Sequence, residues 1–178
     1  SLSRRQRQMC IRDRHKMFYK AIVFLPLIGA IAAGLFSLRK LDGAAVTFSI
    51  TGVCLSFILS CFAFGTIALG GEQAIVDVSR WIGSGSFQAH WTLRFDTLTA
   101  VMLIVVTGVS SCVHIYSVGY MHHDKSIARF MAYLSLFTFA MLMLVTADNL
   151  VQLFFGWEGV GVASYLLIGF WYHKETAH

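Results

Sequence analysis

The chain has 178 residues, of which 57% are hydrophobic and 13% are charged, and its mean hydropathy is +0.68. Soluble globular domains carry about 25% charged residues, so this composition excludes an ordinary soluble domain and predicts a membrane-embedded protein. The net charge of +5 does not indicate a nucleic-acid surface. Residues 1–16 hold six basic side chains and one acidic side chain, whereas basic and acidic residues are equal in number over the rest of the chain.

The basic segment 1–16 lacks the apolar core and the small-residue cleavage site of a secretory signal. Because Met17 stands directly before the first hydrophobic run, we expect residues 1–16 to be foreign to the native reading frame, as a remnant of sequence assembly would be. A basic arm on the membrane surface is the alternative. The chain ends on YHKETAH directly after the last apolar run, and this ending predicts a truncated protein.

Five hydrophobic segments are long enough to cross a hydrocarbon layer about 30 Å thick. They comprise residues 18–38, 44–69, 97–119, 127–147 and 149–172. The predicted fold is therefore an all-α polytopic membrane protein with about five transmembrane helices. Pro26 falls in the early turns of the first segment, where a missing donor does least damage. Only Asp148 and Asn149 separate the last two segments, so we expect these segments to be antiparallel neighbours.

The loop between the second and third segments, residues 70–96, carries a strand pattern. Over residues 87–95 apolar and polar side chains alternate, which is typical of a half-buried strand, and the sequence GSGS before them supplies a turn. We therefore predict a β-hairpin near 74–95 that lies on the outer membrane surface, with Trp81 and Trp91 at headgroup depth. An ordered loop without strands is the alternative.

Basic residues in the short connections indicate the orientation, because short cytoplasmic loops collect Lys and Arg. Three connections carry such residues: the one after the first segment, the one between the third and fourth, and the one after the fifth. With five spans these connections share one side, which we expect to be the cytoplasm or the matrix, and residues 70–96 lie on the opposite side. The basic residues are Arg39, Lys40, Lys125, Arg129 and Lys174.

Glu158 is the only formal charge in the apolar run 150–171. At 1.5 Å per helical residue it lies roughly 12 Å along that helix, within the hydrocarbon layer, where an acid is costly and usually belongs to an ion or proton path. Burial favours a neutral carboxyl and a nearby cation favours a carboxylate, so an acid between the two can change its protonation when its surroundings change. The neighbouring Gly156, Gly159 and Gly161 allow close helix approach or water entry. We therefore predict that Glu158 serves proton translocation, with a permanently paired structural carboxyl as the alternative.

His114 is the second candidate, toward the inner end of the third segment. An imidazole titrates near neutral pH and passes protons through either nitrogen, so His114 is a candidate proton relay. A histidine hydrogen-bonded to a carbonyl near the interface is an equal alternative. His122 and His123 fall in a loop without further ligands, so we predict solvated side chains there and no metal site.

Two acidic residues stand at predicted helix starts. Asp96 precedes the third segment, and Thr99 follows three residues later, which is the pattern of an N-cap. Asp148 and the following Asn149 likewise suit the start of the fifth segment, and we predict a helix cap there, with proton collection by Asp148 at the outer surface as the alternative.

No sequence motif indicates a cofactor. There is no GxGxxG after a strand, no Walker loop and no CxxC or Cys/His metal spacing. Cys54, Cys61 and Cys112 fall in apolar segments, where we expect buried, inert thiols. We therefore predict that the chain has no nucleotide, metal or redox centre and that, within an enzyme, it serves as the ion-conducting part.

Three blocks of sequence resemble the family of subunit L of NADH-quinone oxidoreductase and its mitochondrial counterpart, subunit 5 of NADH dehydrogenase. The most specific block is ADNLVQLFFGWEGVGVASYLLIGFW, at residues 147–171. Residues 95–121 and 126–149 resemble the same family, in the same order and with the same spacing. The similarity covers residues 17–178.

This resemblance implies an antiporter-like subunit in the membrane arm of respiratory complex I, built from inverted repeats with broken helices. Residues 17–126 would form three N-terminal helices, and residues 127–178 the first two helices of a proton-translocation domain. Glu158 would occupy the position of the family's essential membrane glutamate, which pairs with a lysine on a later helix outside this sequence.

The same resemblance implies that NADH, FMN, iron–sulfur clusters and quinone belong to other subunits. The implied partners are the other membrane-arm subunits, the lipid bilayer and protons, with no nucleic acid. The implied location is the bacterial plasma membrane or, alternatively, the mitochondrial inner membrane.

Two other functions stay open. The large subunit of a multisubunit sodium/proton antiporter shares this fold and a similar glutamate block. A structural membrane-arm subunit, in which Glu158 is only a packing contact, is the second alternative.

Overall fold

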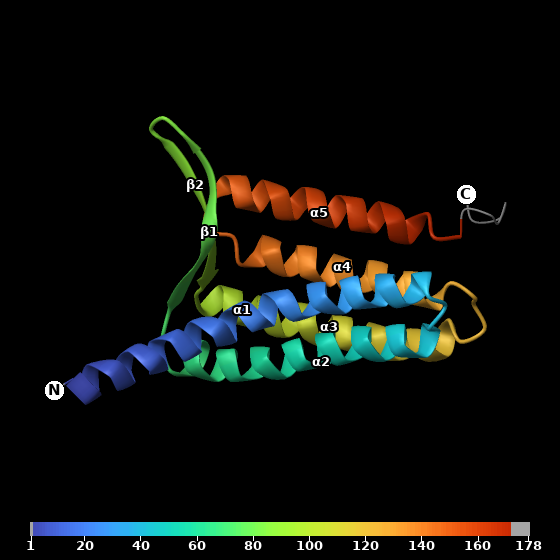
Figure 1. The fold of residues 1–178 in the computed structure, drawn as a ribbon, viewed down its shortest axis with the longest axis horizontal. Coiled ribbons are helices and arrows are strands. Elements are labelled where there is room, and N and C mark those ends of the chain that lie inside the picture. The colour runs from blue at the N-terminus through green and yellow to red at the C-terminus, as the bar shows by residue number, and fades with distance from the viewer. Residues whose placement is uncertain (1, 172–178) are drawn as a thin grey trace.

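Five long helices and one β-hairpin form the fold in the computed structural model, which describes residues 2–171 (Figure 1). Each of these helices contains a stretch long and apolar enough to cross a membrane, which confirms the predicted polytopic membrane fold. A turn of π-helix, Gly65–Leu69, extends the second helix. The elements in chain order are α1 (Leu2–Leu38), α2 (Asp42–Phe64), β1 (Ala74–Ser84), β2 (Phe87–Phe95), α3 (Thr97–Tyr120), α4 (Ile127–Val145) and α5 (Leu150–Ile168).

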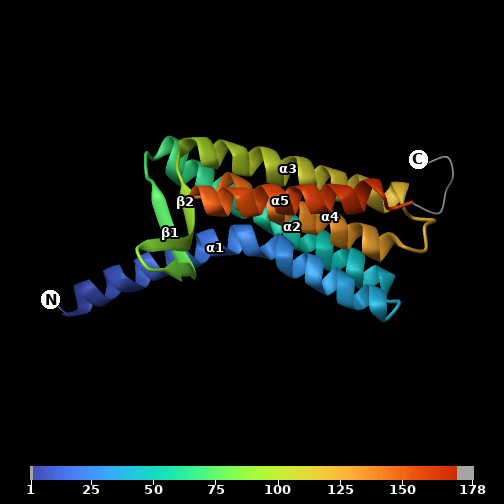
Figure 2. The same cartoon turned by 90° about the horizontal axis from the view of Figure 1, so that it is seen from above.

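Consecutive helices run antiparallel and lie side by side (Figures 1 and 2). The α1–α2 and α3–α4 connections lie at one end of the bundle, which we call the inner end, and the hairpin lies at the other, the outer end. Arg39, Lys40 and Lys125 therefore share the inner end, as their positions in the sequence predicted, and Arg129 lies in the first turn of α4 beside them. Lys174 lies outside the described residues. Which compartment each end faces stays a prediction.

The first helix begins earlier than predicted. It starts at Leu2 and not near residue 18, because residues 2–16 contain neither glycine nor proline to interrupt a helix. Its first turns extend beyond the bundle (Figure 1). The first candidate membrane span begins at Arg14, within this long helix.

Pro26 lies in the interior of α1 and not in its early turns as predicted. A proline has no N–H, so it leaves the carbonyl of Ile22, four residues earlier, without its helical donor. The Ser56 hydroxyl of α2 donates to this carbonyl at 2.5 Å. A neighbouring side chain thus supplies the hydrogen bond that the proline removes, as a helix interior in hydrocarbon requires. Figure 2 shows α1 bending part-way along its length.

The predicted β-hairpin is present. Strands β1 and β2 pair antiparallel, and Gly85 takes a left-handed φ of 59° in the two-residue turn between Ser84 and Phe87. Two irregularities in β1 shift the register, which explains why the alternation in its sequence is loose. Phe87, at the tip, is exposed, whereas Leu93 and Phe95 near the base of β2 are fully buried.

The base of the hairpin is part of the main apolar core. Phe95 packs its ring 4.6 Å from that of Tyr19 in α1, and Leu93 joins the same buried cluster with Leu103 of α3 and Leu142 of α4. The outer ends of these helices are therefore joined through the strands, and this arrangement positions the start of α5.

Candidate functional site

Asn149 fixes the start of α5, the helix that carries Glu158. Its side-chain oxygen accepts a hydrogen bond from the Gln152 N–H at 2.8 Å, and its amide nitrogen donates to the His90 carbonyl of β2 at 2.8 Å. Asp148 is exposed and makes no side-chain hydrogen bond within residues 2–171, so of the two residues predicted to suit the helix start, Asp148 is not the cap. Asn149 takes that role because it directly precedes the first helical residue with an extended backbone.

Glycines bring α5 into close contact with α4. A Cβ atom on Gly156 would lie 2.8 Å from the backbone nitrogen of Leu144, and one on Gly159 would lie 3.2 Å from the Cβ of Ala140. Gly161 has open space around it. Two of the three glycines therefore serve helix packing, as small residues do between membrane helices.

Glu158 lies away from this glycine contact, on an open face of α5. Among residues 2–171 its side chain is exposed and has no hydrogen-bond or ion-pair partner. Phe154, Val162 and Tyr165, at helical spacing from it, are exposed as well. The sequence analysis predicted a buried carboxyl. Residues 2–171 do not bury it, because within them α5 packs almost solely against α4.

The depth of Glu158 makes this exposure significant. The residue lies roughly 12 Å from the outer end of α5 and roughly 15 Å from its inner end, by helical rise. A carboxylate in the middle of a span is stable only beside polar groups, a countercharge or water. The open face of α5 therefore requires a covering structure that supplies one of these.

His114, on α3, is fully buried in a polar network between helices. Its Nδ1 lies 2.7 Å from the Ser110 carbonyl, and its Nε2 lies 3.0 Å from the Ser135 hydroxyl of α4. A carbonyl can only accept, so the neutral ring carries its proton on Nδ1 and accepts the Ser135 hydrogen at Nε2. The ring thus joins α3 to α4 with both nitrogens bonded.

The network continues into α2. The Ser135 and Ser49 hydroxyl oxygens lie 2.5 Å apart, and the Ser49 hydroxyl also lies 3.2 Å from the Met131 carbonyl. Because Ser135 uses its hydrogen toward His114, Ser49 gives its single hydrogen to Ser135 in this arrangement, and it donates to the Met131 carbonyl only when its hydroxyl turns away from Ser135. Ser49, Ser135 and His114 therefore form a directed chain of hydrogen bonds across three helices.

A second branch leaves the other side of the ring. The Ser110 hydroxyl lies 3.3 Å from Nδ1 of His114 and contacts the Thr138 hydroxyl of α4, which donates in turn to the Leu134 carbonyl at 3.0 Å. The imidazole thus has hydroxyl neighbours on both nitrogens. Such an arrangement can receive a proton on one side and release one on the other.

The structure does not bring His114 and Glu158 together. His114 lies roughly 9 Å from the inner end of α3, whereas Glu158 is near the middle of α5, and α4 contacts both helices. Within the described part of the chain no hydrogen bond joins the two groups. They are separate sites on opposite sides of α4.

Gln152 is a residue that the sequence analysis missed. It is fully buried, and its Oε1 accepts the Thr92 N–H of β2 at 3.2 Å. Next to it, the Arg94 N–H of β2 donates to the Thr146 carbonyl at 2.9 Å. The α4–α5 turn therefore adds to the free edge of the hairpin. A glutamine inside an apolar run was the only signal for this contact.

Asp96 caps α3 as predicted. Its carboxylate accepts the Thr99 N–H at 2.9 Å, and Arg94 lies 3.7 Å from its other oxygen. The backbone hydrogen bond from Thr99 lowers the pKa of Asp96 below its usual value, and partial burial opposes this shift. The carboxylate is thus held in its charged form at the helix N-terminus.

The cysteines differ from expectation. Cys61 and Cys112 are exposed and Cys54 is half-buried, because these positions lie on outward faces of α2 and α3. Within residues 2–171, no three His, Cys, Asp or Glu side chains cluster closely enough to hold a metal ion. The lack of a redox or nucleotide centre stays a prediction.

Comparison with known families gives two matches. Residues 81–131 match the family described as the N-terminus of chain 5 of NADH-ubiquinone oxidoreductase (complex I). Residues 147–178 match the family described as the transmembrane domain of NADH:quinone oxidoreductase and the Mrp antiporter. The second match includes Glu158 and the glycines that pack α5 on α4.

Relatives from plants and bacteria match most of the chain. NADH-ubiquinone oxidoreductase chain 5 of Triticum aestivum is 54% identical over 161 residues, which cover 89% of this chain and 24% of the relative. NADH-quinone oxidoreductase subunit L of Rickettsia conorii is 52% identical over 158 residues, which cover 88% of this chain and 24% of the relative. The chain thus spans about a quarter of the length of the relatives it matches, and it is a multi-pass membrane protein that belongs to the family of NADH-quinone oxidoreductase subunit L and NADH-ubiquinone oxidoreductase chain 5.

Proposed function

We propose that this chain is part of a proton-translocating membrane-arm subunit of NADH:quinone oxidoreductase, in which Glu158 is a titrating group of the proton path. The observation that carries the proposal is the placement of Glu158: mid-span on α5, turned away from the glycine contact with α4 and without a partner among residues 2–171. An ionisable group at that depth is a functional candidate by default. The names of the relatives compared above are those of subunits of this enzyme.

In this proposal the open face of α5 is covered in the complete protein by a segment that supplies a cation. Approach of the cation favours the carboxylate, and its withdrawal or loss of water favours the neutral acid. Quinone reduction in other subunits moves this segment, so Glu158 loads a proton in one state and releases it in the other. NADH, FMN, iron–sulfur clusters and quinone are bound by other subunits. The helices of this chain contact those subunits or lipid.

His114 supplies a relay in the same proposal. A proton that arrives at Ser49 displaces the hydrogens of Ser49 and Ser135 along the chain, and Nε2 of His114 takes up the last of them. The resulting imidazolium then releases its Nδ1 proton to the Ser110 hydroxyl, which passes its own hydrogen to Thr138, and Thr138 gives up its hydrogen to a water molecule or another acceptor outside the described residues. Each transfer among these side chains moves one proton between neighbouring atoms. The ring is then neutral with its proton on Nε2, so the hydroxyls must rotate and the ring must regain its Nδ1 proton, by turning over or by exchange with water, before the next cycle.

The test is Glu158→Gln in the complete subunit, assembled in its complex and reconstituted in sealed vesicles. We expect proton pumping per NADH oxidised to fall severely while the complex still assembles. Glu72→Gln is the matched control, because Glu72 is an exposed acid in the loop after α2. Undiminished pumping in assembled Glu158→Gln complex would reject the proposed role.

A sodium/proton antiporter subunit is the second candidate, since the family matched at residues 147–178 includes the Mrp antiporter. This candidate predicts that a sodium gradient alone drives proton movement without NADH. A purely structural subunit predicts instead that Glu158→Gln lowers assembly and leaves pumping per assembled complex unchanged.

A further inference from the structure

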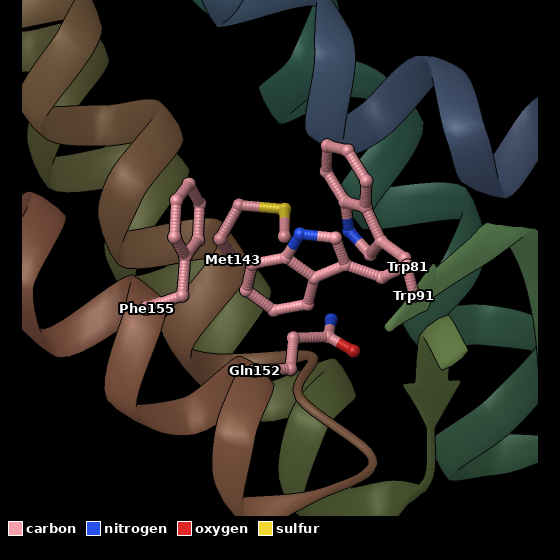
Figure 3. Close-up of a pocket in the computed structure, with 5 residues that line it drawn as sticks. All are labelled: Trp81, Trp91, Met143, Gln152 and Phe155. Atoms are coloured by element: carbon pink, nitrogen blue, oxygen red, sulfur yellow. The ribbon is translucent and has the colours of Figure 1, made fainter. Parts of the chain in front are cut away.

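A small cavity lies where the hairpin meets α4 and α5, at the outer end of the bundle (Figure 3). Its volume is about 70 Å³. Trp81 of β1 and Trp91 of β2 form one side, and Met143 of α4 with Gln152 and Phe155 of α5 form the other. Trp81 and Phe155 also contact each other edge to face, with ring centroids 5.3 Å apart. Four separate elements therefore build this cavity, and neither candidate proton-path residue lines it.

The orientation of the Gln152 amide is fixed by its neighbour. Its oxygen must face the Thr92 N–H, because a backbone N–H can only donate and the two groups are 3.2 Å apart. The amide nitrogen, Nε2, therefore faces the other way, among the cavity side chains (Figure 3). This nitrogen is buried and has no hydrogen-bond acceptor among residues 2–171.

Trp91 presents a second donor of the same kind. Its indole Nε1 is buried and lacks an acceptor within the described residues. Trp91 directly precedes Thr92, so the strand that bonds the Gln152 oxygen also carries the indole into the cavity. Buried donors in folded proteins nearly always have an acceptor, so two of them at one small cavity point to an oxygen that the described residues do not supply.

We infer that this cavity is a binding site for a neutral oxygen acceptor, held between the Trp91 indole N–H and the Gln152 amide. The donors are uncharged and the other walls are aromatic rings and a thioether, so an anion would lose its hydration without a countercharge. A single ordered water needs roughly 10 to 15 Å³ of cavity space, so 70 Å³ admits a small group and not a large ligand. Two sources present such an oxygen here: ordered water, and the ester carbonyl of a lipid at the depth where interfacial tryptophans lie.

The bound oxygen would join β2 to α5 at a second point. Thr92 and Gln152 are already bonded directly, and the occupant adds a bridge from the neighbouring indole to the other end of the same amide. The hairpin and the first turn of α5 are then held by a continuous set of hydrogen bonds. This role is independent of proton transfer through Glu158.

The test is a density map of the complete subunit, assembled in its complex in lipid nanodiscs, at a resolution that shows water. We expect a peak within about 3.2 Å of both Nε1 of Trp91 and Nε2 of Gln152. An isolated peak identifies water, and a peak continuous with acyl-chain density identifies a lipid ester, so either form supports the site. Absence of a peak shared by the two donors, or a protein acceptor bonded to each of them, would overturn the inference.

Donor variants sharpen the test. Trp91→Phe removes the N–H and keeps an aromatic ring, so we expect loss of the shared peak. Trp81→Phe is the matched control, because it changes the second indole and leaves both orphaned donors in place, and the peak should persist. A peak unchanged by Trp91→Phe would contradict the assignment. Should Trp91→Phe fail to assemble, the map of the unaltered protein decides the question alone.

Discussion

The bundle interior around His114 and the open face of α5 around Glu158 each hold one ionisable group in an apolar helix, yet the surroundings of the two groups differ. Both nitrogens of His114 are hydrogen-bonded within the chain, and half of the α4 span beside it is buried. Glu158 has no partner among residues 2–171, and only 17% of the α5 span is buried. A polar group whose hydrogen bonds are all made inside one helix bundle can function within that bundle. An ionisable group that is exposed in the middle of a span needs a partner from a neighbouring structure. The His114 site is thus complete within the described residues, whereas the proposed role of Glu158 requires a group from outside them.

The largest structural effect is expected at the contact that fixes the face of α5. Gly156→Ala places a methyl group 2.8 Å from the backbone of Leu144, so α5 must move away from α4 at a cost of about 1 to 3 kcal/mol. Thermal unfolding and assembly yield of the complete subunit measure this. Gly161→Ala is the control, because nothing lies within 4 Å of its added methyl group and alanine favours a helix. Equal losses in the two variants would show that the glycine contact does not set the position of α5.

The site around His114 is tested by removing one hydroxyl from its hydrogen-bond network. Ser135→Ala leaves Nε2 of His114 without its donor, and we expect a loss of about 1 to 3 kcal/mol in stability together with slower proton translocation. Ser111→Ala is the matched variant, because in the described part of the chain the buried Ser111 hydroxyl bonds only to backbone carbonyls. If both variants slowed translocation equally per assembled complex, the His114 network would have no special part in the path.

A smaller effect is expected where the two regions meet, at the start of α5. Asn149→Ala removes the helix cap and the bond to the His90 carbonyl, which should cost about 0.5 to 2 kcal/mol. Hydrogen exchange of the Thr92 and Arg94 amides, which bond to the α4–α5 region, should then accelerate. Asp148→Ala should change neither quantity, since Asp148 makes no side-chain bond in the described part of the chain. The opposite pattern would restore Asp148 as the cap.

The smallest effect concerns Asp96, at the start of the helix that carries His114. Its pKa is lower in the folded protein than in the unfolded chain, so it adds stability above its unfolded pKa, and this contribution disappears as the pH falls through its folded pKa. Asp96→Ala should cost about 1 kcal/mol at neutral pH. Asp96→Asn keeps an N-cap oxygen but cannot titrate, so its stability should lose this acid dependence. Unfolding midpoints measured across acidic pH would show the difference, and identical acid profiles for the Asp96→Asn variant and the unaltered protein would contradict it.

Local features of the fold could be predicted from the sequence. Apolar length gave the spans, alternation and GSGS gave the hairpin, and Asp96 with Thr99 gave a helix cap, since each depends on residues close together in the chain. The predictions were wrong where residues distant in the sequence determine the local structure. Pro26 is tolerated inside α1 because Ser56, on another helix, bonds the carbonyl that it frees.

Residue type alone indicated the candidate sites, but it did not predict what surrounds each of them. In the sequence, Glu158 and His114 look alike, since each is an ionisable residue in an apolar segment. The difference between them depends on how α4 packs against α3 and α5, which leaves the imidazole hydrogen-bonded and the carboxyl exposed. The contacts of Ser135, Ser49 and Gln152 join residues far apart in sequence, so no local pattern could predict them.

The central claim, that Glu158 changes protonation during turnover, can be measured by infrared difference spectroscopy of the complete complex. Spectra of the resting and NADH-reduced enzyme report the C=O stretch of a protonated carboxyl directly. The account predicts a band in this region that appears or shifts with turnover and is absent in Glu158→Gln, while Glu72→Gln retains it. A difference spectrum that Glu158→Gln leaves unchanged would contradict the account, because Glu158 would then keep one protonation state throughout the cycle.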